Sequence, residues 1–192
     1  ADNDTDAYPL PEPEPITMRP YTSSREPTEC GVGCKQLSLR DQPHSDTFST
    51  DGKSIVYMGV NLREIMYIDV ATGQEFVLDD CEDVECGHPA VDDGLIIYPA
   101  TANRNERTIW QHRLGDTHKR ALLNRPNVER VRPISDIHIH GNAYTWMDSS
   151  IPPDGLYYSQ VGSSEVAHIT DLTCVCYDQP IIGDDFIVYE GR

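Results

Sequence analysis

The chain has 192 residues, with 15 Lys and Arg against 32 Asp and Glu, and a formal net charge of −17. A surface this acidic repels nucleic acid and anionic lipid, so the composition argues against both as partners. The length favours one domain, and no apolar run approaches the ~20 residues of a membrane helix. We expect no cofactor, although calcium is the ion that this acidity would suit.

Residues 1–40 form an acidic, proline-rich leader that also holds the first cysteine pair. Alternating prolines from Pro9 to Pro15 predict an extended, polyproline-like tether. Asp2, Asp4 and Asp6 have the spacing of half a calcium loop, but the loop's glycine and final glutamate are missing. A flexible acidic leader is therefore the better interpretation, and its first residues are typical of a secreted protein after signal removal.

Residues 47–78 contain four short strands in one antiparallel unit. The turns Asp51-Gly52 and Thr72-Gly73 separate runs rich in β-branched and aromatic residues, which is the pattern of hairpins. One such unit cannot bury both of its faces, so it needs neighbours of the same kind.

The remainder of the chain supplies those neighbours. A turn followed by a strand with a large aromatic recurs, and the separations between the aromatics are 41, 48 and 43 residues; they are Tyr57, Tyr98, Trp146 and Tyr189. A four-stranded repeat of about 40–50 residues predicts an all-β fold, a β-propeller of antiparallel blades. We place the propeller at residues 41–192, with blades near 45–78, 88–123, 133–170 and, in part, 179–192.

Two runs of the first unit carry a resemblance to a known family. The stretches Phe48–Tyr57 and Ile68–Gly73 resemble the WD-like blades of TolB-type β-propellers, which have an Asp-Gly-Lys turn and a later Thr-Gly corner. The resemblance covers roughly residues 45–192 and implies the fold, but little about function, because propellers host many activities. The third unit departs from the pattern, with His140 before Gly141.

The fourth unit shows only two strands, so something must complete it. One candidate is a second polypeptide. The other is residues 16–40 of the same chain, where residues 35–39 could form a strand. We favour a second polypeptide, because TolB-type rings are usually larger than four blades.

Six cysteines in three close pairs indicate an oxidising compartment, and therefore a secreted or periplasmic protein. Local disulfides Cys30–Cys34 and Cys81–Cys86 are sterically plausible. A Cys174–Cys176 bond would close a strained ring, so either cysteine could pair elsewhere, and six cysteines allow 15 connectivities. The spacings lack paired zinc knuckles, which makes a zinc site the weaker alternative.

The loops between the second and third strands share one face of such a fold, and rigid blades presenting loops are a usual binding arrangement. We expect this face to contact a partner, with ordinary solvated loops as the alternative. Its candidate residues are Asn61, Arg63, Asn103, Arg104, Asn105, Arg107, Asp148 and Asp154.

His138 and His140 lie two apart on a predicted strand and hence on one face, together with Asp136. These three side chains could share a metal ion, although a polar strand lining a channel is the simpler explanation. No nucleophile motif is present. We therefore expect a non-enzymatic scaffold that binds a protein or glycan partner. The alternative is a carbohydrate-active lyase or hydrolase with its site near these histidines.

Overall fold

In a computed structural model, the structure describes residues 8–22, 48–59, 63–81, 84–102, 106–125, 134–148, 155–171 and 180–189. Every regular element in these ranges is a β-strand, and every strand pair is antiparallel. The all-β prediction is confirmed. The described residues hold no helix with the length and apolarity to cross a membrane.

The first sheet is a meander whose turns follow the predicted Asp-Gly and Thr-Gly signals. Gly52 and Gly73 have φ angles of 84° and 70°, which side chains disfavour and glycine permits. Its strands are β3 (Phe48–Thr50), β4 (Ser54–Met58), β5 (Ile65–Asp69) and β6 (Glu75–Asp79).

The second and third sheets repeat this order, and a two-stranded sheet follows them. In the second sheet β7 and β8 both pair with β9. Its strands are β7 (Val84–Cys86), β8 (Ala90–Asp92), β9 (Leu95–Ala102), β10 (Glu106–Arg113) and β11 (His118–Arg125). The third sheet is β12 (Ser135–His140), β13 (Ala143–Asp148), β14 (Gly155–Gln160) and β15 (Val166–Asp171). The fourth is β16 (Ile181–Ile182) with β17 (Ile187–Val188).

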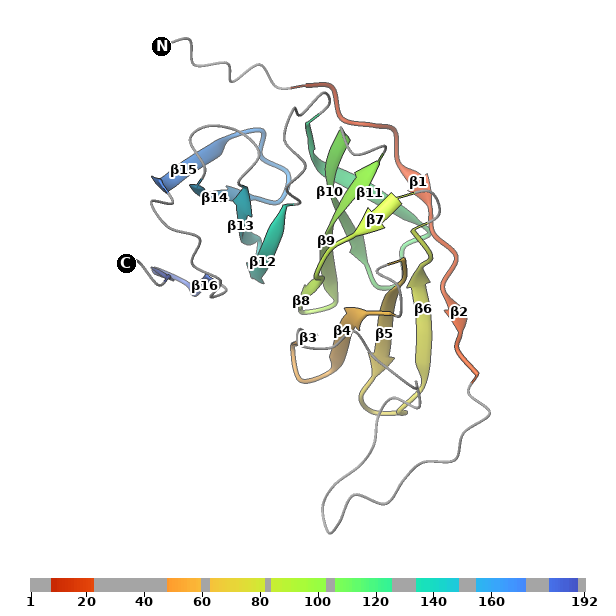
Figure 1. Cartoon of the computed structure of the whole chain (residues 1–192). Helices are drawn as coiled ribbons and strands as arrows, with labels where there is room; N and C mark the ends of the chain where they lie inside the picture. The colour runs from red at the N-terminus through yellow and green to blue at the C-terminus, as the bar shows by residue number, and fades with distance from the viewer. Residues whose placement is uncertain are drawn as a thin grey trace.

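The sheets follow one another around an arc, with β3, β8, β12 and β16 on its inner side (Figure 1). β3 contacts β8, β8 contacts β12, and β12 contacts β16. The outer strands β6 and β11 lie on the far side of their sheets, away from these inner strands (Figure 1). This placement gives each sheet an inner edge against its neighbours and an outer edge facing away.

The core lies between successive sheets. One cluster joins the first and second sheets through Val56, Tyr67, Tyr98 and Trp110, and a second joins the second and third through residues such as Trp146. Three of the four repeated aromatics are buried, with Tyr57 at 3% and Tyr98 and Trp146 at 0% exposure, whereas Tyr189 is 44% exposed.

The N-terminal segment is paired to the body of the protein. β1 (Glu14–Pro15) pairs with the outer strand β11, and β2 (Arg19–Pro20) pairs with the outer strand β6. We call residues 8–22 the strap (Figure 1). The prolines predict an extended tether, and what the sequence did not predict is its pairing with edge strands, which offer unpaired backbone groups to it.

Candidate functional site

The turns between the first and second strands connect neighbouring sheets. Asp51 accepts hydrogen bonds from the backbone N–H groups of Lys53 at 2.9 Å and Ser54 at 2.7 Å within its own turn. Its other oxygen accepts from Gly94 N–H at 3.1 Å, in the corresponding turn of the second sheet. Burial would raise the pKa of Asp51, but these three N–H groups outweigh it and hold the pKa below its usual range.

The same link recurs one sheet further on. Asp92 accepts a hydrogen bond from Gly141 N–H at 2.6 Å, and so ties the second sheet to the third. His140 then replaces the aspartate of the turn, and its Nε2 lies 2.9 Å from an oxygen of Asp184 beside β16. Its Nδ1 lies 3.7 Å from Asp92, so one imidazole contacts both neighbouring sheets.

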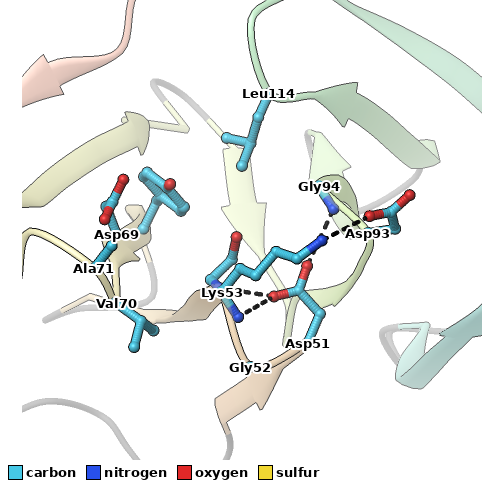
Figure 2. A pocket seen from close by; sticks show the side chains of 11 residues that line it. Asp51, Gly52, Lys53, Asp69, Val70, Ala71, Asp93, Gly94 and Leu114 are labelled. Atoms are coloured by element: carbon cyan, nitrogen blue, oxygen red, sulfur yellow. Dashed lines mark hydrogen bonds and ion pairs between the residues drawn. The ribbon is translucent and has the colours of Figure 1, made fainter.

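A shallow groove of about 570 Å³ lies beside the first two turns (Figure 2). The exposed Lys53 side chain extends across it, and its Nζ lies 3.4 Å from Asp93. The carboxylates of Asp51 and Asp69 are already engaged by backbone N–H groups of their own turns. Asp51 and Asp69 stabilise their own turns and Asp93 contacts Lys53. The groove therefore offers mainly the side chains of Tyr67, Val70 and Leu114 and a single amine.

An ionic cluster joins the strap to the boundary between the first and second sheets. Asp79 and Lys119 are nearly buried, whereas the side chain of Glu14 is 51% exposed. Lys119 Nζ lies 2.7 Å from Asp79 and 3.1 Å from Glu14 of the strap. Tyr98 also donates its hydroxyl to Asp79. Burial would raise the pKa of Asp79, but Lys119 and these hydrogen bonds hold it below its usual range. Sequence reasoning missed this cluster, because its members lie on three segments far apart in the chain.

The sequence predicts that Arg107 and Asp148 belong to an exposed binding face, but the structure buries both side chains. Both side chains are only 1% exposed, and Arg107 NH1 lies 3.8 Å from Asp148 Oδ1 across the boundary between the second and third sheets. Burial lowers the pKa of the Arg107 guanidinium, and the charge of Asp148 opposes that effect. β9 and β10 are each eight residues long, so Arg107 lies inside a strand instead of a loop.

Of the other candidates for that face, Arg63 is exposed. The rest lie outside the described residues: Asn61, Asn103, Arg104, Asn105 and Asp154.

The structure does not support the proposed metal ligands. Asp136, His138 and His140 lie on β12, but the pairing of β12 with β13 is irregular between Ser135 and His138, which interrupts the alternation assumed for Asp136. Within the described ranges, no group of three His, Cys, Asp or Glu side chains could hold a metal ion. Burial, and then the neighbouring His140, lowers the pKa of His138. The groove of Figure 2 is lined by other residues.

The Cys81–Cys86 disulfide is present, as predicted. Both cysteines are buried, and the bond joins the residues just after β6 to the end of β7. Cys30, Cys34, Cys174 and Cys176 lie outside the described residues.

The hairpin of β16 and β17 exposes large apolar side chains. Ile181 and Val188 are directly paired across its two strands and are 53% and 56% exposed. Phe186 and Tyr189 are 57% and 44% exposed. Paired residues share one face of a sheet, so Ile181 and Val188 form a continuous apolar surface.

No family model matches this chain, and no curated protein matches it either. The chain is similar to a solved structure titled "Crystal structure of Nidogen/Laminin Complex", with 15% sequence identity and a TM-score of 0.36. The match covers 62% of this chain and 60% of that chain, so it spans less than two thirds of the other protein's length. A likeness at this level carries no argument about function or partner.

Proposed function

We propose that this chain is a β-propeller-type binding scaffold, secreted or periplasmic, that works without catalysis and assembles with another polypeptide at the β16–β17 hairpin. Successive antiparallel sheets with inner strands in contact support the propeller assignment. The buried Cys81–Cys86 disulfide supports an oxidising compartment.

The observation that carries the assembly proposal is the apolar surface of the hairpin. In each of the first three sheets, at least three further strands accompany the strand that carries the repeated aromatic, and Tyr57, Tyr98 and Trp146 are buried. The hairpin leaves Ile181, Val188 and Tyr189 at least 44% exposed. A contiguous exposed apolar patch of this kind is typical of a surface that another polypeptide covers. Further antiparallel strands beside β17 would bury it as the other sheets bury theirs.

The test is native mass spectrometry of the protein purified from its source without reductant or denaturant. We expect a mass above that of one chain, with slow hydrogen exchange over residues 181–188 that becomes fast once the second polypeptide is removed. Val188→Asp should return the mass to that of one chain, because it places a charge in the covered surface. Asn142→Asp adds the same charge at an exposed turn and should leave the complex intact.

A single-chain mass in the native preparation, or a complex that survives Val188→Asp, would contradict the proposal. The second result would place the assembly surface elsewhere on the molecule.

A further inference from the structure

The first two boundaries between sheets are joined by the same kind of contact. Asp51 accepts a hydrogen bond from the backbone N–H of Gly94 at 3.1 Å, and Asp92 accepts one from the backbone N–H of Gly141 at 2.6 Å. In each contact a carboxylate meets a backbone amide, which is a donor without a charge to lose. Neither link should therefore change between pH 5 and 8.

The boundary between the third sheet and the β16–β17 hairpin is joined by a different pair of groups. His140 Nε2 lies 2.9 Å from the Asp184 carboxylate in the turn of the hairpin. Here the group that meets the carboxylate is an imidazole, which changes charge between pH 5 and 8. The third link is therefore sensitive to pH in a range where the first two are not.

The hairpin has few other attachments to the sheets before it. Its strands form a sheet of their own, and no backbone ladder joins β16 to the third sheet. Ile182 is buried and its cross-strand partner Ile187 is half-buried, so one face of the hairpin packs inward. Among the residues that the structure describes, the pair of Asp184 and His140 is the one hydrogen bond or ion pair between the hairpin and the three sheets.

His140 lies between two carboxylates. Its Nδ1 is 3.7 Å from Asp92, while its Nε2 contacts Asp184. A neutral imidazole has a single N–H, whereas the protonated ring has two and carries a positive charge. Only the protonated ring can thus be favourable toward both carboxylates, and its charge strengthens the hydrogen bond to Asp184. In the neutral form one ring nitrogen turns a lone pair toward a carboxylate.

The strand of His140 also carries His138. Burial, and then the charge of His140, lowers the pKa of His138, so His138 favours its neutral form and does not compete for the proton. The other titratable groups on β12 and on the elements packed against it are carboxylates and phenols, which change charge outside the range of histidine. They are Asp136 on β12, Asp92 and the following Asp93 at β8, Tyr98 on β9, Tyr144 and Asp148 on β13, and Asp184 and Asp185 in the hairpin.

We propose that His140 is a pH-dependent latch for the β16–β17 hairpin. Its protonated imidazole holds the turn of the hairpin against the second and third sheets, and loss of the proton loosens the hairpin. By linkage, the attachment is strongest at the acidic end of the histidine range and weakens as the pH rises through it. His140 and Asp184 are 43% and 91% exposed, so solvent screening limits the change to a few fold. The latch acts within one chain and does not depend on assembly at the hairpin.

The test is hydrogen exchange followed by mass spectrometry of the intact chain, in a preparation whose native mass is that of one chain. Exchange is measured at pH 5.5 and 7.5, and each rate is divided by the intrinsic rate at that pH to give a protection factor. Protection over residues 181–188 should be about threefold lower at pH 7.5. Protection over β13 should not fall between the same pH values, which shows that the loosening is local.

Three variants identify the groups responsible. His140→Gln removes the charge and should give the lower protection of the hairpin at both pH values. Asp184→Asn removes the charged acceptor and should also abolish the pH dependence. His140→Lys carries a positive charge at both pH values, so the protection of the hairpin should no longer fall as the pH rises.

His118→Gln is the matched control, because it removes an exposed histidine from β11, and the pH dependence of the hairpin should stay that of the parent. Protection over residues 181–188 that is equal or higher at pH 7.5 in the parent chain would overturn the inference. So would a loss of protection with rising pH that persists in any of the three variants at His140 and Asp184.

Discussion

The carboxylate of Asp51 and the backbone N–H of Gly94 join two turns that are 43 residues apart, at 3.1 Å. The same carboxylate also accepts two N–H groups of its own turn. One side chain therefore fixes a turn and a sheet boundary together.

Asp51→Ala should lower the free energy of unfolding by about 2 kcal/mol, because three backbone N–H groups lose a charged acceptor. Asp51→Asn keeps one acceptor oxygen for some of these N–H groups, so it should lower the free energy of unfolding by less than Asp51→Ala. Urea unfolding at neutral pH measures both, and Asp116→Ala at an exposed turn serves as the control. Equal stability of Asp51→Ala and the parent chain would show that the contact contributes nothing.

Breaking the buried pair of Lys119 and Asp79 should have a larger effect. Lys119→Met leaves Asp79 buried without its cation, which costs about 3–5 kcal/mol for pairs of this kind. Arg19→Ala removes an exposed cation whose partners, Asp80 at 3.8 Å and the half-buried Glu64 at 3.9 Å, are distant, and should cost less than about 1 kcal/mol. The two unfolding curves should differ clearly in midpoint, and similar midpoints would contradict the assignment of a buried ion pair.

Arg107 and Arg63 provide a direct comparison between a structural and a surface arginine. Arg107→Met should destabilise the protein by about 3 kcal/mol, since Asp148 then stays buried beside an apolar side chain. Arg63→Ala should change stability by less than about 0.5 kcal/mol, because the side chain is exposed. Thermal unfolding checks both variants, and an Arg107→Met protein as stable as the parent would show that the buried pair with Asp148 does not contribute to stability.

Stability should fall on acidification. Burial lowers the pKa of His112, so its neutral form is favoured in the folded state and the unfolded chain binds the proton more readily. By linkage, stability is lost as pH falls from about 6.5, the ordinary histidine value. Asp51 and Asp79, with lowered pKa values, add a further loss below about pH 4.

Thermal unfolding between pH 7.5 and 5 measures the histidine part of this effect. His112→Leu should reduce the slope of midpoint against pH, whatever it does to the midpoint at pH 7.5. A midpoint that rises as the pH falls from 7 to 5 would show that the sign is wrong.

The Cys81–Cys86 bond closes a short loop, with a sequence separation of 5. The loop-entropy model gives about 2 kcal/mol for a ring of this size. The Cys81→Ala, Cys86→Ala double variant should therefore unfold at a correspondingly lower urea concentration than the oxidised parent. Reduction of the parent should lower the midpoint at least as much, because it also opens any bond among the other four cysteines. An unchanged midpoint in the double variant would show that the Cys81–Cys86 bond does not contribute to stability.

Local signals in the sequence predicted the strands well. The Asp-Gly turns and the aromatic anchors Tyr57, Tyr98 and Trp146 are governed by neighbours in the chain and by a regular repeat, and the structure places them in turns and in the core. The repeat did not give strand length, so Arg107 was assigned to a loop although β10 includes it.

Contacts between segments far apart in the chain could not be predicted from the sequence. Lys119 is one charged residue among many until Asp79 and Glu14 are brought to it by the first sheet and the strap. The prolines of the strap indicated an extended chain, but not that Glu14 and Arg19 each begin a strand paired with a sheet edge. A strand of two residues is too short to show an alternating pattern in the sequence. His140 was noticed as a departure from the repeat, and its contacts with Asp92 and Asp184 appear only when three sheets are assembled.

Pro15 and Pro20 give the strap one more property. Proline has no backbone N–H, so a strand that contains it can pair with one neighbour but is a poor template for the next. The strap therefore ends the first and second sheets instead of lengthening them. Proteolytic nicking between residues 22 and 48, followed by loss of the strap, would leave β6 and β11 as bare edges, and we expect nicked protein to polymerise at concentrations where the intact chain stays dispersed.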